Sequence, residues 1–308
     1  MYKSEKENED FLKIKNTFSK CRWEKPRLSQ GERISSKVSW ELESEETIPA
    51  SFDWRDVNGT NYVSISKNQH IPTYCGSCWA HGTTSALTDR FQILNGPKAN
   101  PISLSPQVVV NCQPGGGSCF GGNPLDVYEF AYRQGIPDDS CQQYTAHNSQ
   151  KPLCSPMQIC QDCSSPAPKE GEDGKIRCHP VTKYKSYFVK EYGRVAGAPR
   201  MKAEISKRGP IDCGIEVTEK FHSYKGGIYE EHKGYWNINH AIAVVGWGIE
   251  NGIEYWIGRN SWGSYWGEAG YFRIRMHKWN NAIEEDCNWA VPSHTKVSEQ
   301  EDYLEFLE

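Results

Sequence analysis

Twelve cysteines constrain this 308-residue chain more than any other feature of its sequence. Disulfides form and persist in oxidising compartments and are rare in the cytosol, so this number favours a protein of the secretory pathway. Five of the cysteines fall within residues 141–180, among prolines and the polar run 164–177. That composition predicts a disulfide-stapled loop region. The sequence alone allows many pairing schemes and does not choose among them.

The charge and the hydropathy exclude several classes of partner. A net charge of −4 and a pI near 6.2 give no reason to expect nucleic acid or an anionic membrane surface. The longest apolar run, around residues 241–245, is far too short to span a bilayer, so we expect no membrane span. The start Met1–Ser4 lacks the apolar stretch of a signal peptide, so for a secreted protein the signal is absent from this chain. Asn58 begins an Asn-Gly-Thr glycosylation acceptor.

Composition divides the chain into three parts. Residues 1–47 are rich in Lys, Glu and Ser and have no sustained apolar period, which predicts a short leader segment. The composition changes around residues 48–55, with Phe52 and Trp54 among them, and we expect one folded body over 48–292. The acidic tail 293–308 is expected to be disordered.

Within the body the apolar pattern changes from helical to strand-like. Apolar positions after Cys78 fit one face of a long helix, which Asn95-Gly96-Pro97 should end. Shorter helices are predicted at 105–111 and 125–134. Strands punctuated by glycines are predicted at 211–217, 241–249, 254–259 and 270–276. Helices first and strands later indicate the α+β class with two subdomains.

Three residues in recognisable contexts predict a nucleophilic thiol. Cys78 lies in Cys-Gly-Ser-Cys-Trp, His240 in Asn-His-Ala, and Asn260 in Asn-Ser-Trp-Gly. A helix start and a neighbouring imidazolium would hold Cys78 as a thiolate, and the amide of Asn260 would orient the imidazole of His240. Trp262 would cover that hydrogen bond from water. A cysteine alone is usually half of a disulfide and a histidine alone is usually a core residue, but the three together favour catalysis.

These motifs resemble the papain family of cysteine proteases, over roughly residues 49–290. The resemblance implies a papain-like α+β fold with a helical left subdomain, a β-barrel right subdomain and a cleft between them. Cys78 would lie on the helical wall, with His240 and Asn260 on the barrel wall. It also implies peptide and protein substrates. Residues expected to contact them are His70, Tyr74, Gly121, Gly122 and Trp262.

The chain departs from the family pattern at two places. His240 lies 162 residues after Cys78, against roughly 130–150 in papain-like enzymes, and the cysteine-rich region can absorb the excess. The family's oxyanion-hole glutamine belongs six residues before the nucleophile, where this chain has Pro72. Removing His70-Ile71-Pro72 would restore the spacing of Gln69. We therefore expect Gln69 to donate to the oxyanion together with the backbone N–H of Cys78.

The insertion His70-Ile71-Pro72 resembles that of one group within the family, lysosomal carboxypeptidases that remove a single C-terminal residue. A loop there would shorten the cleft on the leaving-group side, and protonated His70 could pair with the substrate's terminal carboxylate. Such a charge-assisted contact contributes about 1.5–3 kcal/mol. An ordinary histidine pKa of about 6.5 would strengthen it in an acidic compartment. We therefore expect a cysteine-type carboxypeptidase of the lysosome, the endosomal pathway or the extracellular space, acting as a monomer on free C-termini.

The same resemblance suggests how the cysteines pair. Twelve cysteines less the nucleophile leave an odd number, and Cys21 stands apart in the leader. Cys21-Arg22-Trp23 resembles the proregion cysteine of that group, which blocks the active-site cysteine in the proenzyme. The resemblance thus implies the bridges Cys21–Cys78, Cys75–Cys119, Cys112–Cys154, Cys141–Cys160, Cys163–Cys178 and Cys213–Cys287.

Three alternatives remain open. The first is an endopeptidase or dipeptidase of the same fold. The second is a metal-binding protein, because Cys75-x-x-Cys78 and Cys160-x-x-Cys163, with His81 and His179 nearby, imitate zinc-ligand spacing. The third is a non-catalytic adhesion protein, which no Arg-Gly-Asp sequence supports. The favoured reading requires neither a cofactor nor a metal.

Overall fold

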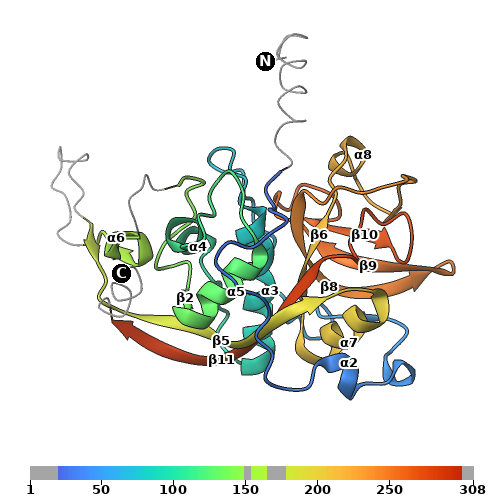
Figure 1. The fold of residues 1–308 in the computed structure, drawn as a ribbon, viewed down its shortest axis with the longest axis horizontal. Helices are drawn as coiled ribbons and strands as arrows, with labels where there is room; N and C mark the ends of the chain where they lie inside the picture. Colours follow the sequence, from blue (N-terminus) through green and yellow to red (C-terminus); the bar gives the residue numbers. More distant parts are fainter. Residues whose placement is uncertain (1–19, 149–153, 165–177, 300–308) are drawn as a thin grey trace, which may run out of the picture.

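A computed structural model describes residues 20–148, 154–164 and 178–299 of the chain. Figure 1 shows helices α3, α4 and α5 gathered in one half and strands β6, β8, β9 and β10 in the other. The α+β class is therefore confirmed. In the described residues, no helix is both long enough and apolar enough to cross a membrane.

The predicted helices are present. The long helix α3 begins at Cys78 and ends at Asn95, where Gly96 adopts a φ of 83° that favours glycine over other residues. Ser105 caps α4 by accepting a hydrogen bond from the N–H of Val108. The helices are α2 (Ser39–Leu42), η1 (Glu45–Thr47), α3 (Cys78–Asn95), α4 (Pro106–Cys112), α5 (Pro124–Arg133), α6 (Pro156–Ile159), α7 (Ala198–Arg208) and α8 (Glu219–His222).

Most strands of the described chain belong to one sheet, in the order β2-β5-β11-β6-β8-β9-β10-β7, with β1 paired to β8. The four predicted strands correspond to β6, β8, β9 and β10, and β8 starts at His240 opposite Ile215 of β6. The strands are β1 (Phe52–Asp53), β2 (Ile136–Pro137), β3 (Gln161–Asp162), β4 (His179–Pro180), β5 (Lys183–Val195), β6 (Ile211–Ile215), β7 (Ile228–Tyr229), β8 (His240–Glu250), β9 (Ile253–Arg259), β10 (Tyr271–Arg275) and β11 (Cys287–Glu299).

The longest strand pair was not predicted from the sequence. Strands β5 and β11 run antiparallel, from Cys287 opposite Val195 to Glu299 opposite Lys183. The prediction of a disordered tail from residue 293 is therefore wrong for 293–299, because the backbone there pairs with β5. Residues 300–308 lie outside the described part of the chain.

Buried ion pairs connect helix α3 to the other half of the molecule. Arg90 of α3 and Glu204 of α7 are both fully buried, with Nη1–Oε1 at 2.9 Å. The Arg90 guanidinium also donates to the carbonyl oxygens of Gly209, Pro210 and Ala290. Asp89, the residue directly before Arg90, pairs with Arg259 of β9 at 2.6 Å.

The leader residues 20–47 pack along this body (blue in Figure 1). Asp126, at the start of α5, accepts hydrogen bonds from the backbone N–H groups of Arg27, Leu28 and Ser29. Further along, the Oγ of Ser39 in α2 donates to Glu204 at 2.6 Å. Carboxylates of the body thus hold the backbone and side chains of the leader.

The Arg90→Ala variant should lose about 3–5 kcal/mol in free energy of unfolding, because it leaves the buried Glu204 with only the more distant Arg208 guanidinium, 3.8 Å away. Guanidinium denaturation under non-reducing conditions measures this. The matched control is Arg200→Ala, which removes an exposed arginine of α7 and should change the free energy by less than about 0.5 kcal/mol. Equal losses in both variants would contradict the structural role of Arg90.

Candidate active site

Cys78 is the first residue of α3 and is fully buried. Its position at a helix N-terminus supplies partial positive charge from unpaired backbone N–H groups. In this form its sulfur is bonded to that of Cys21, and the N–H of Ala241 in β8 lies 3.3 Å from the Cys78 Sγ. The thiol is therefore both oxidised and covered by the leader.

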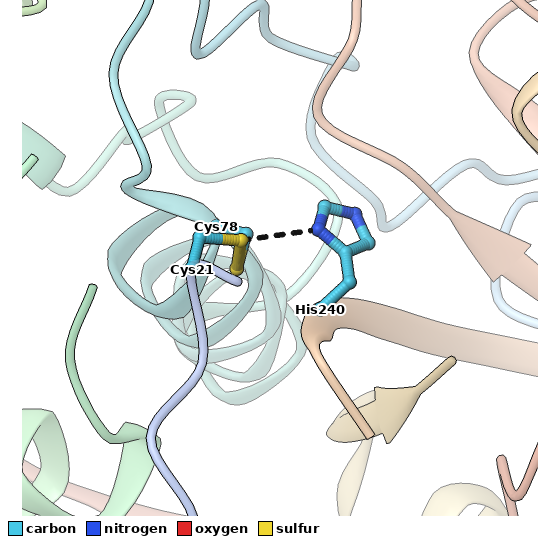
Figure 2. A group of neighbouring side chains, drawn as sticks. All are labelled: Cys21, Cys78 and His240. Carbon is cyan, nitrogen blue, oxygen red and sulfur yellow. Dashed lines mark hydrogen bonds between the residues drawn. A yellow bond between two sulfur atoms is a disulfide. The ribbon is translucent and has the colours of Figure 1, made fainter. Parts of the chain in front are cut away.

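Asn260 fixes the tautomer of His240. The Asn260 Oδ1 already accepts a hydrogen bond from the backbone N–H of Ser261 at 2.8 Å, so this atom is an acceptor. It lies 2.9 Å from Nε2 of His240, which must then carry the proton in the neutral ring. Nδ1 is left with its lone pair toward the sulfurs, 3.2 Å from Sγ of Cys21 (Figure 2). The two sulfurs and a His240 ring nitrogen all lie within 4.8 Å of one another.

Burial holds His240 neutral in this form. It lowers the pKa of His240 to about 4, against the raising effect of the Asn260 hydrogen bond, with further lowering by the nearby His70 and His222. Trp262 packs on the ring, with centroids 5.0 Å apart, and so shields the His240–Asn260 hydrogen bond from water. A disulfide carries no negative charge, so the imidazolium lacks the thiolate that would stabilise it, and the Asn260 hydrogen bond alone does not offset burial.

Gln69 lies beside these residues with its side chain fully engaged. Its Oε1 accepts from the Ser261 hydroxyl at 2.6 Å, and its Nε2 donates to the carbonyl of Cys75 at 3.0 Å. The amide nitrogen of glutamine has two hydrogens, and one of them remains for an oxyanion. The side chain is thereby held in a single orientation, as an oxyanion donor needs.

The insertion places His70 against Tyr74, with the rings stacked at 4.8 Å. Burial and the charge of His222 lower the pKa of His70 to about 4, well below the ordinary histidine value assumed from the sequence. Among the described residues, its buried Nδ1 has no hydrogen-bond partner. His70 is therefore neutral at mildly acidic pH in this form.

Gly121 and Gly122 contact the leader segment. The N–H of Gly122 donates to the Cys21 carbonyl at 3.2 Å, and the N–H of Trp23 donates to the Gly122 carbonyl at 2.7 Å. A Cβ atom on Gly121 would lie 2.6 Å from the Trp23 indole nitrogen, so this close approach requires glycine. On the opposite side, the N–H of Cys21 donates to the Asn239 carbonyl at 3.0 Å.

The six disulfides of the structure are the six pairs implied by the resemblance: Cys21–Cys78, Cys75–Cys119, Cys112–Cys154, Cys141–Cys160, Cys163–Cys178 and Cys213–Cys287. The four cysteines with zinc-like spacing are all consumed in these bridges, so they offer no thiolate to a metal. His81, the histidine near the first pair, is buried and packs edge-on against Tyr144.

Several residues of the site were missed from the sequence. Ser261 orients Gln69, and His222 also packs against Trp262, with ring centroids 5.0 Å apart. Arg22 of the leader is buried and pairs with Asp286. The Asn-Ser-Trp motif contained the signal for Ser261, whereas nothing in the sequence relates residues 22 and 286.

The geometry suits nucleophilic attack by sulfur once the disulfide is opened. A thiol at a helix start, a base with a ring nitrogen within 4.8 Å of its sulfur and an amide that fixes the base occupy one buried cluster. Gln69 adds a donor beside it. Backbone groups of Gly122 and Asn239 on either side can pair with an extended peptide, as they pair with residues 21–23 here.

Comparisons with known proteins agree with this chemistry. The family model described as papain family cysteine protease matches residues 48–291. Cathepsin Z of Onchocerca volvulus is 46% identical over 80% of this chain and 79% of its own length. A cathepsin B-like cysteine proteinase 4 of Caenorhabditis elegans is 34% identical over 81% of this chain and 77% of its own length.

Among solved structures, procathepsin B S9 of Trypanosoma congolense is similar with a TM-score of 0.68. It is 24% identical, and the match covers 91% of this chain and 88% of that one, which shows a shared fold. The sequence resemblance to the papain family and its fold is confirmed. The resemblance indicated by the His-Ile-Pro insertion, to cathepsin X or Z, is confirmed as well.

Reduction of the Cys21–Cys78 bridge should raise the pKa of His240 from its value of about 4, because a thiolate at Cys78 stabilises the imidazolium. Titration of the histidine ring protons by NMR, with and without reductant, measures the change.

The control is the double variant Cys21→Ser/Cys78→Ser, because the Cys21 sulfur itself lies 3.2 Å from the His240 Nδ1. This variant has no thiol next to His240, which should keep its low pKa. A His240 pKa that does not move on reduction would contradict the predicted ion pair.

Proposed function

The chain belongs to the papain family of cysteine proteases, and we propose that it is a carboxypeptidase that removes single residues from the C-termini of peptides. The position of His70 carries the proposal. It directly follows Gln69, whose side chain is held next to the site by Ser261 and by the carbonyl of Cys75, and this supports a position of His70 near the bond to be cut. A loop in this place limits how much of a substrate can extend past the nucleophile.

Two features suit His70 to hold a terminal carboxylate. Stacking on Tyr74 fixes the ring, and the buried Nδ1 is unpartnered within the described residues. Burial raises the pKa of Tyr74 to about 12, so that its hydroxyl stays neutral and adds no negative charge to repel a carboxylate. A carboxylate bound here would raise the pKa of His70 and gain a charge-assisted hydrogen bond.

The reaction that we propose uses the side chains of the site alone. The Cys78 thiolate adds to the carbonyl carbon, and Gln69 and the Cys78 backbone N–H stabilise the oxyanion. The imidazolium of His240 gives its Nδ1 proton to the leaving amine, and the C–N bond breaks to leave a thioester. His240 then takes a proton from water, the hydroxide adds to the thioester, and the thiolate leaves. Asn260 holds the ring throughout.

We propose that the described form is a proenzyme, with residues 1–47 as its proregion and 48–292 as the peptidase domain. The Cys21–Cys78 bridge blocks the nucleophile, and the segment around Arg22 covers it. Activation then needs both reduction and removal of the proregion. The disulfides and the exposed acceptor Asn58 support a glycoprotein of the lysosome or the extracellular space.

After activation, the enzyme should cleave a peptide with a free C-terminus and release single residues, and should leave the C-terminal amide of the same peptide nearly uncut. Mass spectrometry of the products reads both outcomes. In His70→Ala, the preference for the free acid should fall by about 10-fold or more, the value of one charge-assisted contact.

The matched control is His179→Ala, an exposed histidine of the disulfide-stapled region, which should keep the preference. Cys78→Ala should cut neither peptide. Internal cuts in both peptides would leave the family chemistry intact and favour the endopeptidase alternative.

The ratio of free-acid to amide cleavage should rise as pH falls from about 7 to about 4.5, because His70 becomes cationic only toward its lowered pKa of about 4. The titration of His240 affects both peptides alike and cancels in this ratio. The kcat/KM values of the two peptides across this range give the measurement. A ratio that stays flat, or that rises equally in His70→Ala, would contradict the anchor role.

A further inference from the structure

Arg22 of the proregion occupies a position next to the blocked nucleophile. The N–H of Gly122 donates to the carbonyl of Cys21, and the N–H of Trp23 donates to the carbonyl of Gly122. Arg22, between these two residues, therefore faces Gly122. The segment runs parallel to Gly122 here. An antiparallel peptide can use the same N–H and carbonyl of Gly122 through its own facing residue. Whether the bound peptide runs parallel or antiparallel, the side chain of its residue facing Gly122 points to the place that the Arg22 side chain occupies here.

The surface around the Arg22 side chain pairs with one end of a flat cation, Nη2, and encloses Nε and Nη1, which are buried with no hydrogen-bond partner among the described residues. Only 6% of Arg22 is exposed, and its guanidinium lies over Gly214, where a Cβ atom would come within 3.0 Å of Nε and 3.2 Å of Cζ. The same Cβ would come within 2.6 Å of Ile238. At the end of the side chain, Nη2 donates to the Asp286 carboxylate at 2.6 Å and to the Asp286 carbonyl at 3.3 Å.

The charge around this position is negative. The Asp286 carboxylate is about one-third exposed, and the Asp212 carboxylate lies buried behind it. Asp212 accepts from Asn288 with one oxygen, while its Oδ1 has no hydrogen-bond partner among the described residues. Burial raises the pKa of Asp212 to about 6, and the charge of Arg22 opposes that shift. When the proregion leaves, these two carboxylates lose their cation.

We propose that Gly214, Ile238 and Asp286 form an arginine subsite, which binds an arginine or lysine side chain of the substrate at the residue facing Gly122. The inference rests on the thiol chemistry at Cys78, and it holds for single-residue and for internal cleavage alike. Arg22 is next in the chain to the residue bonded to Cys78, so we place the substrate residue facing Gly122 next to the one whose carbonyl is attacked, which makes it the second residue before the cut. For removal of one C-terminal residue, that is the third residue from the C-terminus.

The test compares two free-acid peptides that differ only in arginine or citrulline at the third residue from the C-terminus. Citrulline has nearly the shape of arginine without the charge, so any preference reports the carboxylate. The activated enzyme should favour arginine by about 10-fold or more in kcat/KM, and Asp286→Asn should reduce the preference to about twofold or less. The control Asp162→Asn, which changes an exposed carboxylate on β3, should keep it.

Equal cleavage of both peptides by the unmodified enzyme would overturn the subsite, as would a preference that survives in Asp286→Asn. Product masses show where each peptide is cut. Internal cuts would refute the carboxypeptidase proposal, and the preference would then be read at the second residue before each cut. The two proposals therefore fail separately.

A second measurement needs no turnover and uses the full chain. After mild reduction, the proregion still covers Cys78, and peptide mapping measures how fast iodoacetamide alkylates this cysteine. Arg22→Met and Asp286→Asn should each speed alkylation, and the double variant should be no faster than the faster single one, because both remove the same contact. Additive effects, or no effect of either variant, would overturn the assigned contact.

Discussion

The close approach of α3 to β8 determines the rest of the site. At Gly82, one helical turn after Cys78, an added Cβ would lie 3.3 Å from the backbone of Ala241 and Ile242. Helix and strand can come this near only because residue 82 has no side chain. The contact places the start of α3 next to the start of β8, and so sets Cys78 beside His240. The buried pairs of Arg90 and Asp89 hold the same helix to the strand-rich half further along.

The position of His240 beside Cys78 does not by itself make the proenzyme active. With Cys78 in a disulfide, the negative charge that would stabilise an imidazolium is missing, and burial keeps His240 neutral. The side chains of the site are thus already in position, but the thiolate and imidazolium charges are absent. Reduction changes a single bond and restores the charge without moving the base, because Asn260 and Trp262 already hold the ring. The protein can therefore be fully folded before it is active.

Local signals predicted much of this structure. The glycine after Asn95 ended α3, the Ser105 cap started α4, and the motifs around Cys78, His240 and Asn260 identified residues that the fold brings together. Properties that depend on contacts between distant segments were not accessible. The strand β11 became visible only through its pairing with β5, and residues that read as an acidic tail were part of it. The lowered pKa of His70 depends on burial and on His222 of α8, which no pattern in the sequence relates to the insertion.

The Arg22–Asp286 contact combines inhibition with recognition. A proregion that must leave after activation cannot rely on a large apolar core, and this one is held by many polar contacts to carboxylates such as Asp126 and Glu204. Placing a cation of the proregion in a site that also suits a substrate cation requires no separate surface for inhibition. The proregion cation and a substrate cation cannot bind at the same time, because one guanidinium fills the space over Gly214. After the proregion leaves, a substrate with the matching charge can occupy the same position. Inhibition and substrate preference therefore depend on the same carboxylate.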